Sequence, residues 1–212
     1  MTETTIHLDD GTRLAAVVDG PKERGTVVFA HGSGSSRHSS RNQHVADSLR
    51  ERGLRTVLAD LLTPVEERVD VRTAEHRFDI DLLTARVAGL VDWAVDVDEA
   101  IHIGLFGAST GAAAALRAAA ERPDRVHAVV SRGGRPDLAG ALALGKVAAP
   151  TLLVVGGDDQ VVLDLNRVAA GHLRCPHALE IVPGATHLFE EPGALDRVAE
   201  LAGAWFEDHL GG

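Results

Sequence analysis

The chain has 212 residues, of which 45% are hydrophobic and 25% charged, and this predicts one globular domain over residues 1–212. A net charge of −10 and 3% aromatic residues argue against nucleic-acid partners and anionic membranes. Cys175 is the single cysteine, which excludes an internal disulfide and a multi-cysteine metal site.

The chain opens with a hairpin pattern and continues with alternating strand and helix patterns. Ile6–Leu8 and Leu14–Val18 flank the turn sequence Asp9-Asp10-Gly11. Short apolar runs, typical of strands buried on both faces of a parallel sheet, follow at Thr26–Ala30, Thr56–Ala59, Ile101–Phe106, His127–Ser131, Thr151–Val155 and Leu179–Val182. Helical patterns occupy Arg41–Arg52, Asp79–Val95, Gly111–Glu121, Leu163–Leu173 and Ala194–His209.

This order predicts the α/β class, with a doubly wound, mostly parallel sheet of about eight strands, an N-terminal hairpin and helices on both faces. Roughly twenty residues separate Ser131 from Thr151. Because so short a connection has no room for a substantial lid, we expect an open site.

The strongest motif is Gly107-Ala108-Ser109-Thr110-Gly111, which lies between a predicted strand and a predicted helix. This is the Gly-x-Ser-x-Gly pattern of a nucleophile elbow, in which the glycines relieve crowding around a sharp turn. The turn places Ser109 at a helix N-terminus, where negative charge is favoured. A Gly/Ser-rich turn without catalytic function is the alternative.

A serine nucleophile needs a base and an orienting acid, which follow it in the order Ser, Asp or Glu, His. His187 lies in a glycine-containing loop after the last predicted strand, and we predict that it is the base. Asp158 and Asp159 both follow the preceding strand. We prefer Asp159 as the acid, because the Gly-Gly turn then has one more residue to clear the strand.

The sequence His31-Gly32-Ser33-Gly34 follows the third predicted strand. The backbone N–H groups of Ser33 and Thr110 are predicted to form the oxyanion hole, with His31 bracing the loop. A phosphate-binding loop is the rival interpretation, but this segment lacks the Lys and the glycine spacing of such loops.

With these residues assembled, the chain resembles the α/β-hydrolase superfamily over nearly its full length. It is most similar to the compact branch related to dienelactone hydrolases, with Ser109 where some members carry cysteine. The stretch Ser131-Arg-Gly-Gly-Arg-Pro-Asp137 is similar to a bacterial subgroup of hydrolases, relatives of which are sometimes fused to phosphoribosyltransferase-like domains. The resemblance implies a triad and a reaction class and leaves the substrate open.

Arginines follow the strands whose carboxyl ends should form the site, and guanidinium groups suit carboxylate or phosphate. An anionic substrate is therefore one hypothesis, with Arg37, Arg132 and Arg135 as its candidate ligands. Structural ion pairing is the alternative. The other arginines in this position are Arg41, Arg72 and Arg77, and the candidate acidic partners are Asp60, Asp79, Asp81 and Asp137.

Together these features predict a serine hydrolase that cleaves a small ester or thioester through an acyl-enzyme on Ser109. The alternatives are a non-catalytic binding or regulatory module, and an acyl transferase or lyase with the same triad. We expect a small-molecule substrate, no cofactor, no metal, no nucleic-acid partner and no membrane association, and the sequence is compatible with a homodimer. The N-terminus has no secretory pattern, so a cytoplasmic location is expected.

Overall fold

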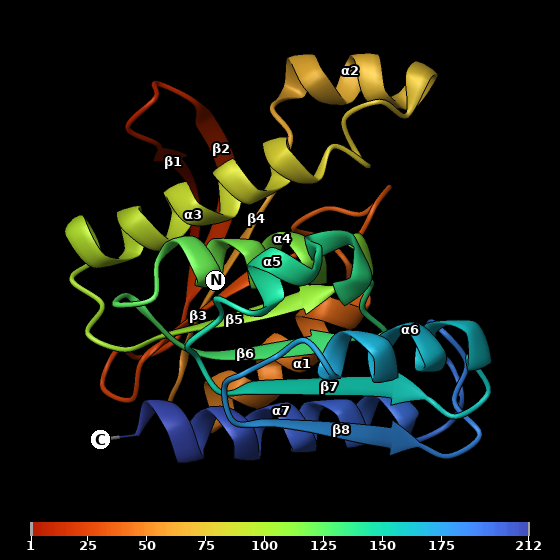
Figure 1. Ribbon diagram of the computed structural model, residues 1–212. Coiled ribbons are helices and arrows are strands. Elements are labelled where there is room, and N and C mark those ends of the chain that lie inside the picture. The colour runs from red at the N-terminus through yellow and green to blue at the C-terminus, as the bar shows by residue number, and fades with distance from the viewer. Residues whose placement is uncertain (1, 212) are drawn as a thin grey trace.

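The structure, a computed structural model, describes residues 2–211 and is built on one eight-stranded sheet (Figure 1). The strand order is β1-β2-β4-β3-β5-β6-β7-β8. β1 pairs antiparallel with β2 and β2 antiparallel with β4, and all later pairs are parallel. The strands are β1 (Thr2–His7), β2 (Arg13–Asp19), β3 (Thr26–Ala30), β4 (Arg55–Ala59), β5 (Ile103–Ala108), β6 (Val126–Arg132), β7 (Thr151–Gly156) and β8 (His177–Val182).

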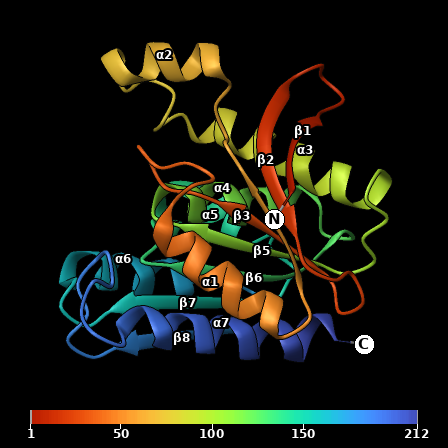
Figure 2. The same ribbon diagram turned by 180° about the vertical axis from the view of Figure 1, so that it is seen from behind.

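Helices cover both faces of the sheet, which confirms the predicted doubly wound architecture. α1 and α7 pack together on one face, in front of the strands in Figure 2, and α3 packs against α4 on the other. The helices are α1 (Ser40–Glu51), α2 (Pro64–Thr73), α3 (Ile80–Asp96), α4 (Thr110–Glu121), α5 (Ala141–Leu144), α6 (Gln160–Ala170) and α7 (Ala194–Leu210), with a 3-10 turn, η1, at Pro136–Ala139.

The core has a separate apolar layer on each face of the sheet, as continuous apolar strands require. Phe29 of β3 and Phe106 of β5 lie with ring centroids 4.9 Å apart and pack into the layer beneath α1 and α7. β3 and β5 are fully buried. The central strands are therefore rigid supports for the loops at their carboxyl ends.

Several predicted boundaries shift, and two helices, α2 and the short α5, were not predicted. β5 begins at Ile103, because Ile101 is exposed before the strand begins, and α6 begins at Gln160. α2 has a full capping box between Thr63 and Glu66, with proline in its first turn. Its exposed valines gave no buried apolar stripe, so periodicity did not detect it. No helix within residues 2–211 is long and apolar enough to cross a membrane.

Candidate active site

Ser109 lies on a strained turn between β5 and α4. Its φ of 51° and ψ of −122° place it in a backbone region that residues other than glycine rarely adopt. A Cβ atom at Gly107 would lie 2.5 Å from the Ala112 Cα, and one at Gly111 would lie 2.2 Å from the Ala30 carbonyl oxygen. Glycine is thus required on both sides, which gives the motif its physical basis.

The structure brings His187 together with Asp159. His187 Nδ1 lies 2.6 Å from Asp159 Oδ2, whereas the neighbouring Asp158 side chain is exposed. A carboxylate bonded to Nδ1 fixes the ring orientation and leaves Nε2 for proton transfer. His187 and Ser109 line the same cavity, of about 240 Å³. Of the two adjacent aspartates, Asp159 is therefore the one in contact with His187.

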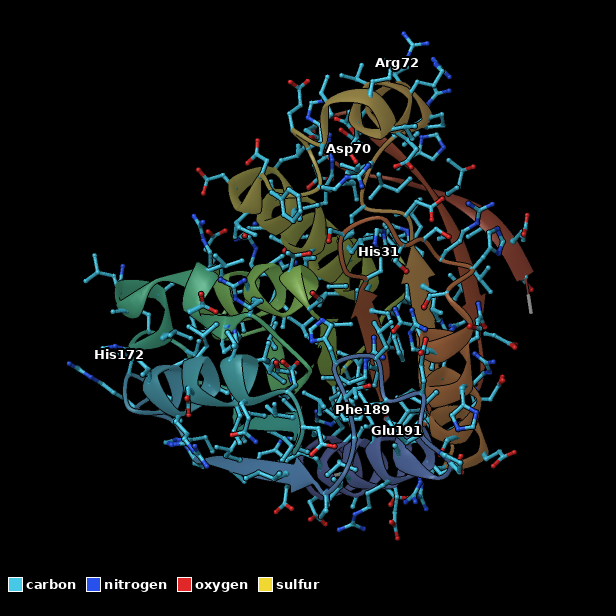
Figure 3. The ribbon with its side chains drawn as sticks, turned by 90° about the vertical axis from the view of Figure 1, so that its right-hand side faces the viewer. His31, Asp70, Arg72, His172, Phe189 and Glu191 are labelled. Atoms are coloured by element: carbon cyan, nitrogen blue, oxygen red, sulfur yellow. The ribbon has the colours of Figure 1, made fainter. Side chains whose placement is uncertain are left out.

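The His187 loop is held against the end of β7 and by its own side chains. A Cβ atom at Gly156 would lie 2.3 Å from the Ala185 carbonyl oxygen, so the loop crosses directly over the strand end. Thr186 donates from its N–H and its hydroxyl to the Glu191 carboxylate at 3.1 and 2.6 Å. Phe189 is 2% exposed, and Figure 3, which faces this edge of the sheet, shows it beside Glu191.

The last two residues of β6 and the turn that follows, residues 131–135, hold the serine turn in place. The Ser109 N–H donates to the Arg132 carbonyl at 3.3 Å, and the Arg135 N–H donates to the Ser109 carbonyl at 3.0 Å. Gly133 has a φ of +49°, and a Cβ atom there would lie 3.1 Å from the His187 carbonyl oxygen. One short segment thus contacts both the serine turn and the histidine loop. Sequence reasoning assigned Arg132 and Arg135 of this stretch to substrate binding but did not predict its contacts with the serine turn, for which the paired glycines at a strand end were the available signal.

The predicted oxyanion donors lie beside Ser109. A Cβ atom at Gly32 would lie 3.0 Å from the Ser109 Cβ, so the loop after β3 runs against the nucleophile. Thr110 is the first residue of α4, and its N–H has no partner within the helix. The Ser33 N–H donates to Thr110 Oγ1 at 3.0 Å. This bond holds the loop to the helix, and the Ser33 N–H must leave or share it to reach an oxyanion.

His31 braces the same loop, as expected. Its Nδ1 lies 3.0 Å from the Gly32 carbonyl oxygen, and the Leu61 N–H donates to its Nε2 at 3.0 Å. Because Nε2 accepts, the ring is neutral and donates from Nδ1. Burial lowers the pKa of His31 below its ordinary value. The ring therefore links the loop after β3 to the segment that follows β4.

Of the three arginines predicted to bind substrate, only Arg132 lines the cavity that contains Ser109. Arg37 is bound to the Asp60 carboxylate through its N–H and its guanidinium. Arg135 forms a bidentate pair with Asp137 at 2.8 Å. The pairing alternative thus accounts for both, and neither lines the cavity. Arg132 does line it, together with Ser109 and His187.

Two further arginines named from the sequence, Arg77 and Arg72, also lie outside the cavity wall. Arg77 donates from Nε to the buried Asp70 carboxylate at 2.6 Å. Burial raises the pKa of Asp70, but the hydrogen bonds and charge of Arg77 outweigh this effect and lower the pKa below its ordinary value. Arg72 points outward from α2, away from His31, in Figure 3. Within residues 2–211, no group of three His, Cys, Asp or Glu side chains is arranged to hold a metal ion.

Comparison with known proteins identifies the same fold and family. The alpha/beta hydrolase domain family matches residues 23–201. A dienelactone hydrolase from Anabaena variabilis is 51% identical in its crystal structure, with a TM-score of 0.94 over 99% of this chain and 98% of that one. A serine hydrolase homologue from Coxiella burnetii, 22% identical with a TM-score of 0.78 over 96% of each chain, shares the fold. These matches confirm the resemblance predicted from the motifs.

Two curated relatives are longer proteins. They come from two strains of Mycobacterium tuberculosis, are 58% identical over 193 residues, and carry the provisional name phosphoribosyl transferase. The match covers 90% of this chain and 42% of theirs, so this chain spans less than half the length of those proteins.

Proposed function

We propose that this chain, which belongs to the alpha/beta hydrolase domain family, is a serine hydrolase that cleaves a small carboxylic ester or thioester. The observation that carries the proposal is the 2.6 Å contact between Asp159 and His187, with His187 and Ser109 on one cavity. The dienelactone hydrolase title of the 51% identical structure supports an ester as the substrate, since a lactone is a cyclic ester. The transferase name belongs to proteins of which this chain matches 42%, and we attach no such activity to it.

The reaction has two steps. His187 Nε2 takes the proton of the Ser109 hydroxyl as its Oγ bonds to the carbonyl carbon, and Asp159 stabilises the imidazolium through Nδ1. The tetrahedral oxyanion accepts hydrogen bonds from the N–H groups of Ser33 and Thr110. The intermediate collapses, the bond to the leaving alkoxide or thiolate breaks, and that group receives the proton from His187. A water molecule then attacks the acyl-enzyme by the same route, releasing the carboxylic acid and Ser109.

The adjacent aspartates provide a matched test of this mechanism. We expect Asp159→Asn to lower kcat by about 10³- to 10⁴-fold on 4-nitrophenyl esters, because the amide no longer holds His187 in the required tautomer. Asp158→Asn makes the same chemical change one residue away on an exposed side chain, and we expect kcat within about twofold of wild type. Equal effects of the two substitutions, or turnover that survives Ser109→Ala, would refute the proposed roles.

A further inference from the structure

Arg132 is a buried cation for which residues 2–211 supply no acidic partner. It is 8% exposed at the end of β6, and its Nε and Nη1 are inaccessible and have no hydrogen-bond acceptor among residues 2–211. Burial and the charge of Arg41 lower its pKa to about 10, so it remains charged at neutral pH. Burying a charge without a counter-ion is costly, and proteins seldom retain one without a use. Arg132 also lines the cavity that contains Ser109.

The rest of the cavity wall favours an anion as well. None of the described residues that line it is an aspartate or a glutamate, and Arg41 adds a second cation, paired at 3.3 Å with Glu190 outside the wall. Ser39, Arg41 and Asn42 belong to the N-cap and first turn of α1, which has no acidic residue in that turn. The free N–H groups at a helix N-terminus attract negative charge.

We infer that Arg132 and the first turn of α1 form a subsite for an oxoanion, a carboxylate or a phosphate, carried by the substrate. The cavity of about 240 Å³ is small for a ligand site, so the anion and the scissile carbonyl belong to one compact molecule. An anion in the cavity brings a negative charge beside the buried positive charge of Arg132, and this gain is confined to anionic substrates. The inference rests on the proposed hydrolase function and specifies its substrate class.

Two esters of equal length test this subsite. Mono-4-nitrophenyl adipate carries a free carboxylate, and 4-nitrophenyl methyl adipate has the same chain with that group masked. We expect wild type to prefer the anionic ester in kcat/KM, and Arg132→Gln to reduce the anionic-to-neutral ratio by about ten- to hundredfold. Arg132→Lys should retain part of the preference. Arg135→Gln removes an arginine that is paired with Asp137 outside the cavity, and should leave the ratio unchanged. A ratio that is the same in wild type and Arg132→Gln would overturn the inference.

A binding measurement separates failure of the subsite from failure of the hydrolase function. In the Ser109→Ala background, we expect inorganic phosphate or adipate to raise the Tm at millimolar concentration, and Arg132→Gln to abolish the rise. The anion that gives the larger rise in Tm shows whether the subsite prefers a phosphate or a carboxylate. A rise that persists in Arg132→Gln, or no rise with either anion, would overturn the subsite. Fluorophosphonate labelling of the wild-type protein reports the nucleophile independently of this result.

Discussion

Replacing Arg132 by methionine should stabilise the free protein. In the fold, the pKa of Arg132 is lowered from its ordinary value to about 10, chiefly because of burial. At 1.36 kcal/mol for each factor of ten, charging this group in the fold costs about 3 kcal/mol. Because the folded-state pKa is the lower one, the cost is fully present below pH 10 and disappears as the pH rises above that value. Methionine keeps the packing of the aliphatic stem without the charge.

The gain at pH 7.5 should be about 1–3 kcal/mol in the free energy of unfolding, or a Tm rise of several degrees for a domain of this size. Urea denaturation in a chloride buffer measures it without an oxoanion that would bind and stabilise the wild type. Arg135→Met is the control. It breaks the pair with Asp137, which is partly exposed, and should cost up to about 1 kcal/mol. A loss of more than 1 kcal/mol in Arg132→Met would show that its charge is compensated in the free protein, and would refute the reasoning.

Two further predictions concern the serine turn and the loop beside it. Gly111→Ala would place Cβ 2.2 Å from a backbone oxygen of Ala30, so we expect the free energy of unfolding in urea to fall by about 2–4 kcal/mol and turnover to be lost. Gly11→Ala is the control: a Cβ there has no atom within 4 Å, but the residue has a φ of +84°, and the substitution should cost about 1 kcal/mol. Equal costs would contradict the steric explanation. Burial lowers the pKa of His31, so its stabilising contribution is full above pH 6.5 and is lost as the pH falls below that value. His31→Gln should therefore weaken the dependence of the unfolding free energy on pH below 6.5. An unchanged pH dependence would contradict the role of the neutral ring in bracing the loop.

The sharp turn at Ser109 could be predicted because most of its requirements lie within five consecutive residues. Gly107 and Gly111 flank Ser109 at fixed spacing, and the close approaches that demand glycine come from the turn itself and from the adjacent strand β3. The choice between Asp158 and Asp159 was less secure, because it depends on which carboxylate the loop turns toward His187. His187 lies 28 residues further along the chain, so local sequence does not show which aspartate faces it.

The arginines were harder to predict because ion pairing is a tertiary property. Asp60, the partner of Arg37, is 23 residues distant in the sequence, and no local pattern identifies it. The isolation of Arg132 is the reverse case: its sequence context resembles that of Arg135, and its burial and lack of an acceptor emerge only when β6 is packed. Sequence reasoning could therefore name the set of arginines but could not identify Arg132 as the one that is buried at the cavity.

The role of Ser109 is tested most directly by covalent labelling with a fluorophosphonate, followed by mass spectrometry of the intact protein and its peptides. We predict one adduct per chain, on Ser109, absent in Ser109→Ala and formed at least a hundredfold more slowly in His187→Ala, because the serine hydroxyl then lacks its base. Folded wild-type protein that takes up no label at Ser109, or that is labelled equally fast without His187, would contradict the proposed serine hydrolase mechanism.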